Sequence, residues 1–426
     1  MQPVSGVGEY WAVGKFKGRG LLAALAALSA LTLVGCAATV DGVAMLAAAP
    51  SPTVAALDTG NYPTTAGHPF GAAGRDGDSF EGRRIAEYVT GPWQAKATLL
   101  QLDPLATIPL NHDTLSNVFS DPLPAVAVAH GLIAGFSSAR STQGTDREHA
   151  LLNAVLRFPD IDSAAAAAGE MAAKNPVPAG DPAGEPVAID RHPQAAATAY
   201  RNLDGSIKVE SFTAHGPFVL FQSALSDPSA TGSPLYAQML VESALDDQEP
   251  LIDRFPATDP AKLADLPKDP TGQLLARTLW APDDSAPANI GVWPTRAWLH
   301  YETDPIAASA LLSADNVDVV SQRLTTVYQA RDASAARHLV IRLAAQMEAL
   351  PEVHASAAEV PGFPGARCFV RVNGYAPTTY AMSFRRIGWH FKCVAQADRY
   401  AFTAFSDQER DVKQQMSAQY RILAGK

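Results

Sequence analysis

The stretch Ala154-Val-Leu-Arg-Phe-Pro-Asp-Ile-Asp-Ser163 combines a strand-like run with the start of a capped helix. Residues 154–158 alternate in the manner of a half-buried strand. Asp160 or Asp162 can then accept hydrogen bonds from the first helical amides, which predicts a helix over residues 163–174. We expect three strands and a second helix to follow, over residues 197–201, 207–213, 218–224 and 234–246.

A second copy of this order begins roughly 170–180 residues later in the chain. Residues 325–328 are the strand, Asp332 is the cap, and residues 334–350 have apolar side chains at helical spacing. Further strands are expected over residues 368–372, 379–385, 390–396 and 400–406, before a last helix. The repetition predicts an α+β protein of two tandem related domains, each an antiparallel sheet with helices packed on one face.

Composition changes along the chain suggest where these domains begin and end. Residues 37–53 are rich in Ala, Pro and Ser, and residues 247–287 are rich in Asp and Pro, with one helix candidate at 271–279. The expected segments are a signal peptide, a flexible tether, a first α+β domain, a connector and a second α+β domain with a disulfide. Their respective bounds are residues 1–35, 36–56, 57–250, 251–288 and 289–426.

The N-terminus has the three parts of an export signal. Lys15, Lys17 and Arg19 form a basic region, and the apolar run of residues 21–34 is too short for a membrane span of roughly 20 residues. The run ends in Leu33-Val-Gly-Cys36, which resembles the bacterial lipobox. We therefore expect cleavage before Cys36 and a diacylglyceryl lipid on its thiol. The alternatives are an ordinary signal peptide with a chance cysteine, or a short transmembrane anchor.

The two remaining cysteines, Cys368 and Cys393, both lie in strand-like sequence. An exported protein meets an oxidising compartment, so a structural disulfide between them is the leading expectation. Two free thiols are a second possibility. A redox or metal role is a third, although redox pairs more often have the closer Cys-x-x-Cys spacing.

The net charge of −10 disfavours nucleic-acid binding, which needs clustered Lys and Arg. The sequence contains neither of the common phosphate-binding glycine motifs, and no two of its ten histidines have i, i+4 spacing. Asp246-Asp247 and Asp283-Asp284 fall in polar connector sequence, where solvated charge is the usual explanation. We therefore expect no metal site and no cofactor.

Residues 135–139, Gly-Phe-Ser-Ser-Ala, come nearest to a nucleophile motif. A nucleophile elbow needs glycine where Ala139 stands, and His130 alone does not complete a triad. We therefore expect no catalytic residue. Six aromatic residues on strand-like stretches could line a pocket, although core packing is the commoner outcome. They are Trp298, Tyr301, Trp389, Phe391, Tyr400 and Phe402.

Several fragments resemble a family of actinobacterial envelope lipoproteins of unknown function. Leu57-Asp-Thr-Gly-Asn-Tyr-Pro-Thr-Thr65 resembles the family's opening, and Pro250-Leu-Ile-Asp-Arg-Phe255 resembles its connector. Glu81-Gly-Arg-Arg-Ile-Ala86, Gly135-Phe-Ser-Ser-Ala-Arg140 and Val155-Leu-Arg-Phe-Pro159 are also similar. The resemblance implies two related domains and brings no established activity, so it identifies no functional residue.

Together these features predict a non-enzymatic lipoprotein held by its lipid on the outer face of the cytoplasmic membrane, in the cell envelope. Its partner would be a protein or a hydrophobic envelope ligand, without nucleic acid. The rival hypothesis is an envelope hydrolase whose site is assembled from dispersed residues, and a third is a purely structural role. A serine or carboxylate in a cleft, within hydrogen-bond reach of a histidine or second acid, would favour the hydrolase.

Overall fold

The computed structural model describes residues 39–40, 43–44, 50–142, 149–177, 182–227, 233–280, 289–356 and 359–425. The chain divides into two compact units, Met1–Ala48 and Ala49–Lys426. In the first unit, the described residues form the antiparallel strand pair β1 (Thr39–Val40) and β2 (Val43–Ala44). The helices, sheets and cavities described below belong to the second unit.

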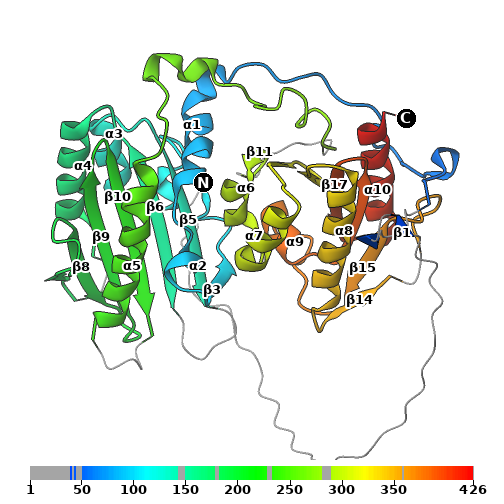
Figure 1. Ribbon diagram of the computed structural model, residues 1–426. Coiled ribbons are helices and arrows are strands. Elements are labelled where there is room, and N and C mark those ends of the chain that lie inside the picture. The colour runs from blue at the N-terminus through cyan, green and yellow to red at the C-terminus, as the bar shows by residue number, and fades with distance from the viewer. Residues whose placement is uncertain are drawn as a thin grey trace, which may run out of the picture. The chain divides into compact units, whose positions relative to one another are not determined.

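The first sheet of the second unit is antiparallel, with strand order β3-β5-β6-β10-β9-β8-β7 and with β4 paired beside β5 (Figure 1). Its last strand, β10, returns to pair with β6. The strands are β3 (Leu99–Leu102), β4 (Ile108–Leu110), β5 (Ala134–Thr142), β6 (Ala150–Arg157), β7 (Glu185–Val187), β8 (Ala196–Arg201), β9 (Ile207–His215) and β10 (Phe218–Ser226).

The second sheet repeats this arrangement with strand order β11-β12-β13-β17-β16-β15-β14, again antiparallel throughout. Here β17 returns to pair with β13, as β10 does with β6. The strands are β11 (Gly291–Pro294), β12 (Val319–Gln322), β13 (Thr326–Gln329), β14 (Val353–Ala355), β15 (Arg367–Arg371), β16 (Phe391–Ala397) and β17 (Tyr400–Ser406). The shared strand order confirms the predicted duplication, and we call the two halves the first and second repeats.

The helices that follow the central hairpins begin as the sequence predicts. The Asp160 carboxylate accepts a hydrogen bond from the Ser163 amide at 2.7 Å, and Asp332 accepts from Ser334 and Ala335 at 2.9 Å each. The α-helices are α1 (Gly77–Ile85), α2 (Pro92–Ala95), α3 (Leu123–Ala129), α4 (Ile161–Lys174), α5 (Leu235–Ile252), α6 (Thr295–Trp298), α7 (Pro305–Ala314), α8 (Ala333–Glu348), α9 (Met382–Ile387) and α10 (Glu409–Ala424). The 3-10 helices are η1 (Val54–Ala56), η2 (Gly74–Asp76), η3 (Ala86–Tyr88), η4 (Leu115–Asn117), η5 (Pro260–Asp265) and η6 (Leu299–Tyr301).

The predicted class, two antiparallel sheets with helices, is confirmed, but the helices cover both faces of each sheet and not one face. On β10, Leu220 packs with α5 in one core cluster, whereas Val219 packs with α4 in another. Successive strand residues point to opposite faces, so α4 and α5 lie on opposite sides of the first sheet. In the second repeat, α8 and α10 are divided in the same way between two clusters. Figure 1 shows α5 running across one face of the first sheet.

Two local predictions differ from the structure. Residues 379–385 were expected to form a strand, but the chain there turns into α9. Residues 271–279 were a helix candidate, but they form turns, in which the Asp269 carboxylate accepts hydrogen bonds from the amides of Thr271 and Leu275. Both segments carry side chains suited to the predicted element, and local polar contacts and packing decide otherwise.

The two repeats share a core. One continuous cluster contains Phe136 and Leu245 of the first repeat together with Trp298 and Leu339 of the second. The N-terminal residues of the unit also cross between repeats, since Tyr62 donates a hydrogen bond to Asp411 on α10 at 2.7 Å. Leu57, predicted to belong to the first domain, is buried in the core cluster that contains α10 of the second repeat.

Candidate functional site

A cavity of about 370 Å³ lies where η3 and α2 of the first repeat meet α6, η6 and α7 of the second. It exceeds the cavity of about 230 Å³ beside α10 and that of about 210 Å³ beside β9. An apolar wall with a few polar groups is the usual composition of a small-molecule site. The wall contains Val89, Trp93, Leu299, Ile306 and Ala310, and the polar groups are Gln94, Arg296, His300 and Ser309. We call this cavity the junction pocket.

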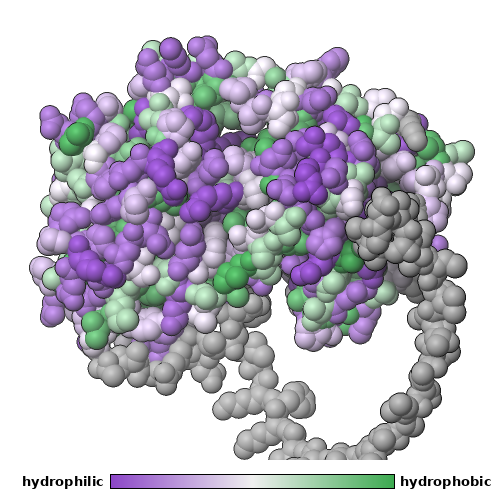
Figure 2. All heavy atoms as spheres, in the orientation of Figure 1, coloured by the Kyte–Doolittle hydropathy of each residue, from purple (hydrophilic) through white to green (hydrophobic). Residues whose placement is uncertain are grey.

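The outer edge of the junction pocket is apolar and open to solvent. Ile306, at the start of α7, is 44 % exposed although it is a large aliphatic residue. Figure 2 shows apolar atoms gathered over α7 within a face that is otherwise mostly polar. An exposed apolar edge of this kind lowers the free energy of any apolar group that covers it.

One side of the pocket carries Arg296 beside Glu87. The Arg296 Nε donates a hydrogen bond to the Glu87 carbonyl oxygen at 2.9 Å. Burial lowers the pKa of Arg296 and raises the pKa of the Glu87 carboxyl, while the attraction between the two charges opposes both shifts. The side chains therefore partly neutralise one another, and the pocket has no strong preference for an anion.

His300 forms the floor of the pocket and is 1 % exposed. Its Nε2 lies 3.0 Å from the Ala86 carbonyl oxygen, which fixes that nitrogen as the donor. Its Nδ1 then accepts a hydrogen bond from the Ser138 hydroxyl at 2.8 Å. Burial lowers the pKa of His300 to about 3, and the nearby Arg140 acts in the same direction.

Arg140, on β5 of the first repeat, forms hydrogen bonds to backbone carbonyl groups of the second repeat. It is 1 % exposed, and its Nη2 donates to the carbonyl oxygens of His300 at 2.9 Å and Glu302 at 2.6 Å. Its Nη1 donates to the Leu100 carbonyl at 2.6 Å, and its guanidinium carbon lies 5.0 Å from the centre of the Trp93 ring. Arg140 therefore positions both Trp93 and η6, which line the junction pocket.

The candidate nucleophile motif at residues 135–139 lies within β5 and not on a strand-to-helix turn. Ser137 donates a hydrogen bond to the Ala106 carbonyl at 2.7 Å, and Ser138 is bonded to His300. Both serines are fully buried, and a histidine with so low a pKa is a poor general base. The distance between Ser138 and His300 is therefore the one expected in a hydrolase. The serine, however, is not accessible to a substrate, and the histidine is too weakly basic.

The other candidates from the sequence have structural roles or fall outside the described residues. His130 pairs with Glu170 at 2.7 Å, and Asp246 pairs with His192 at 3.0 Å. Within the described ranges, no group of three or more His, Cys, Asp or Glu side chains could hold a metal ion. Five of the six aromatic residues are buried, namely Trp298, Tyr301, Trp389, Tyr400 and Phe402, and Phe391 is half-buried. The pair at residues 283–284 lies outside the described ranges.

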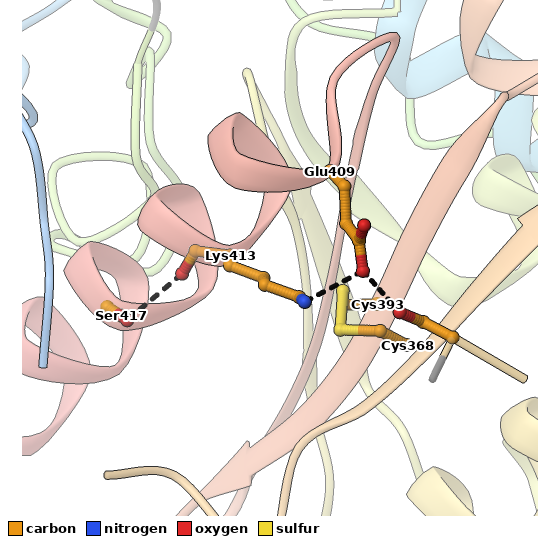
Figure 3. Close-up of a disulfide and its surroundings, with 6 residues drawn as sticks. Cys368, Cys393, Glu409, Lys413 and Ser417 are labelled. Carbon is orange, nitrogen blue, oxygen red and sulfur yellow. Dashed lines mark hydrogen bonds and ion pairs between the residues drawn. A yellow bond between two sulfur atoms is a disulfide. The ribbon is translucent and has the colours of Figure 1, made fainter. Parts of the chain in front are cut away.

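The expected disulfide joins Cys368 on β15 to Cys393 on β16, which face each other across the two strands. Figure 3 shows Lys413 reaching from α10 toward this disulfide, with Glu409 between Lys413 and a neighbouring side chain. Lys413 donates to Glu409 at 2.8 Å, and Glu409 also accepts from Ser356. The disulfide joins β15 to β16, and the polar chain joins α10 to Ser356, the residue that follows β14.

Cys36 and the predicted signal peptide lie outside the described residues. Among the helices that are described, none has both the length and the apolar composition needed to cross a membrane. Sequence reasoning missed Arg140, which stands among serine and threonine residues, and His300, which is a polar residue within the apolar run Ala297-Trp-Leu-His-Tyr301. That pattern marks a buried polar group, but it does not reveal which distant residue is its partner.

The fold and the junction pocket define a duplicated α+β protein with a ligand-sized cavity between its repeats. Residues 69–268 match the model described as domain of unknown function DUF7373, N-terminal, and residues 274–426 match its C-terminal counterpart. The chain therefore belongs to this two-domain family of unknown function.

No curated protein matches the chain. Among solved structures, the extracellular domain of PknH from Mycobacterium tuberculosis is similar at 14 % identity with a TM-score of 0.26. That match covers 39 % of this chain and 95 % of the PknH domain.

Proposed function

We propose that this protein is an actinobacterial envelope lipoprotein, anchored through a lipid on Cys36, that holds an apolar ligand in the junction pocket. The observation that carries the proposal is the pocket's wall of Trp93, Leu299 and Ile306, with an exposed apolar edge. A cavity of about 370 Å³ suits a short acyl chain or a ring system and is too small for a folded partner.

Ligand binding is tested by displacement of a fluorescent fatty-acyl probe from the purified chain. Ile306→Glu places a charge at the pocket's edge and should weaken probe binding roughly tenfold, because burying the ligand's apolar surface would then desolvate a carboxylate. Ile161→Glu is a matched control, since Ile161 is an exposed residue in the first turn of α4, away from the pocket. Equal probe affinity in the wild type and Ile306→Glu would refute the proposal.

Anchoring is tested separately by fractionating cells. Cys36→Ala should move the protein from the membrane fraction to the soluble fraction, because the variant lacks the thiol that would carry the diacylglyceryl group. Continued tight membrane association of Cys36→Ala would contradict lipid anchoring and leave the ligand-binding test unaffected.

The alternative, an envelope hydrolase, rests on the contact between Ser138 and His300. A hydrolase using this pair should react with serine-directed fluorophosphonate probes and lose that reaction in Ser138→Ala. We expect no labelling in the wild-type protein, because Ser138 is completely buried. Stoichiometric labelling of Ser138 would favour the hydrolase over the binding protein.

A further inference from the structure

A second unusual feature lies on the face of the second sheet that α8 covers. There Lys392, on β16, is paired in register with Phe369 and Phe405, both of which belong to the core cluster containing α8. Arg371 is two residues beyond Phe369 on β15 and therefore points to the same face. The strand alternation thus places a lysine and an arginine side by side among aromatic residues.

Lys392, Arg371 and Arg386 have fewer polar partners than buried charges normally have. Lys392 Nζ lies 5.9 Å from the centre of the Trp389 ring and has no hydrogen bond within the described part of the chain. Arg371 Nε is 3.8 Å from Glu352, beyond hydrogen-bond distance, and Arg386, which is 8 % exposed, donates to the Tyr301 carbonyl. The Nε atoms of both arginines are buried without a hydrogen-bond partner among the described residues.

The carboxylates nearby do not balance the positive charge. Glu302 faces Arg140, Arg386 and Lys392, and it already accepts hydrogen bonds from Tyr328 at 3.0 Å and from Trp298. Glu352 is the other carboxylate, beside Arg371. Arg140 also faces the carboxylate of Asp304. Lys392, Arg371 and Arg386 therefore share two carboxylates, and an excess of buried positive charge is unfavourable unless an anion joins it.

The first repeat shows what a balanced version of this position looks like. Counted from the hairpins that pair His215 with Phe218 and Ala397 with Tyr400, Lys392 occupies the position of Glu210. Glu210 is satisfied by its own repeat, with Lys208 at 3.0 Å, Asn175 at 2.6 Å and Ser223 at 3.2 Å. The same comparison places Arg371 at the position of Tyr200. At the position of Glu210 and Lys392 in the duplicated fold, the first repeat has a negatively charged glutamate with three polar partners. The second repeat has a positively charged lysine that lacks them.

We propose that Lys392, Arg371 and Arg386 form a binding site for a phosphate group, either free or in a lipid headgroup. A phosphate group would balance this excess of positive charge, and guanidinium and ammonium groups are the usual donors to phosphate oxygens. Lys392 is partly exposed, which gives an anion in solution a route to the site. This site is separate from the junction pocket and does not depend on the ligand proposed there.

Calorimetric titration of the purified full chain with inorganic phosphate, at constant ionic strength, tests the site. Wild-type protein should bind one phosphate saturably, and Lys392→Met should bind at least roughly tenfold more weakly, since a charge-assisted hydrogen bond is lost. Lys208→Met is the matched control, because it removes a lysine that is already paired with Glu210, and its phosphate affinity should equal that of the wild type. Equal affinity in Lys392→Met would overturn the proposal.

Two further measurements keep the test independent of that variant's folding. In wild-type protein, inorganic phosphate or phosphatidylglycerol vesicles should slow the acylation of Lys392 by an amine-reactive reagent. Acylation of Lys208 serves as the internal reference. Flotation with phosphatidylglycerol vesicles, compared with phosphate in solution, distinguishes a headgroup from a free ion. Binding in either form with protection of Lys392 supports the site. Unprotected acylation of Lys392 in the presence of both forms overturns it.

Discussion

At the scale of single residues, His300 shows how the molecule uses a buried polar side chain. It is surrounded by Trp93 and Phe136, whose ring centres lie 5.2 and 5.1 Å away, and it is hydrogen-bonded through both ring nitrogens. Its two bonded partners belong to the first repeat, whereas His300 belongs to the second. The neutral imidazole therefore joins the repeats, and protonation would leave a charge beside Arg140 in the core.

This arrangement predicts a loss of stability in acid. The pKa of His300 is about 3 in the folded protein and near 6.5 in the unfolded chain. Between these values the unfolded state holds the extra proton, so the free energy of unfolding should fall by up to about 1.4 kcal/mol per pH unit as pH decreases from 6.5. Urea denaturation between pH 7 and pH 4 gives the free energy of unfolding at each pH. Its slope against pH should be shallower in His300→Gln than in the wild type. His112→Gln alters an exposed histidine and should retain the wild-type slope; a shared slope in all three proteins would contradict the role of His300.

Lys392 gives a prediction of the opposite kind, a substitution that stabilises. Burial, together with Arg386 and Arg371 and against Glu302, lowers the pKa of Lys392 from 10.5 to about 8. The charged form of Lys392 therefore lowers the free energy of unfolding. This destabilisation is fully present below about pH 8 and is relieved as pH rises toward 10.5. Lys392→Met should therefore raise the free energy of unfolding in phosphate-free buffer at pH 7 by about 1 kcal/mol. Guanidinium denaturation measures the change, with Lys208→Met as the control that should not stabilise; a loss of stability in Lys392→Met would show that the lysine is adequately paired.

At the scale of elements, the sequence predicts most strands and long helices because burial in each repeat follows regular periodicity. The helix α4 and the strands β8 and β9 fall within about two residues of their predicted bounds, which is the usual uncertainty of helix and strand ends. The short helix α9 was missed because its position is set by Arg386, which donates to Tyr301 in a distant segment. The Ser138–His300 contact was likewise beyond sequence reasoning, since 162 residues separate the two side chains.

The contact between β5 and η6 is the element-level interaction that shapes the junction pocket. Arg140→Leu would leave the carbonyl oxygens of Leu100, His300 and Glu302 buried without this donor. We expect it to lower the free energy of unfolding by about 3 kcal/mol or more, because each buried unsatisfied group costs about 1–3 kcal/mol. The measurement is chemical denaturation combined with the fatty-acyl probe assay, in which affinity should also fall. Arg75→Leu changes an arginine whose side chain is 96 % exposed and should alter neither quantity; an equal effect of both substitutions would remove the special role of Arg140.

At the scale of the whole molecule, the duplication has not produced two independent domains. The shared core cluster includes Trp293 and Trp298 of the second repeat together with Ile85 and Phe136 of the first. Hydrogen bonds between segments of the two repeats also hold them together: Tyr62 is hydrogen-bonded to α10, and η6 is hydrogen-bonded to β5. A ligand in the junction pocket would touch both repeats, so its binding energy would add to the contacts that hold them together.

The intact chain should consequently unfold in one cooperative transition, and its repeats should be unstable when separated. Fragments 50–280 and 289–425, expressed alone, should bind a hydrophobic dye and unfold without a sharp transition, because each exposes half of the shared core. Mixing the fragments should restore cooperative unfolding by far-ultraviolet circular dichroism. A matched control is the intact chain folded first and then cut at a protease site introduced within residues 281–288, which should keep both halves associated. If each fragment instead unfolds cooperatively near the melting temperature of the intact chain, the repeats are independent domains, and the junction pocket is only a surface between them.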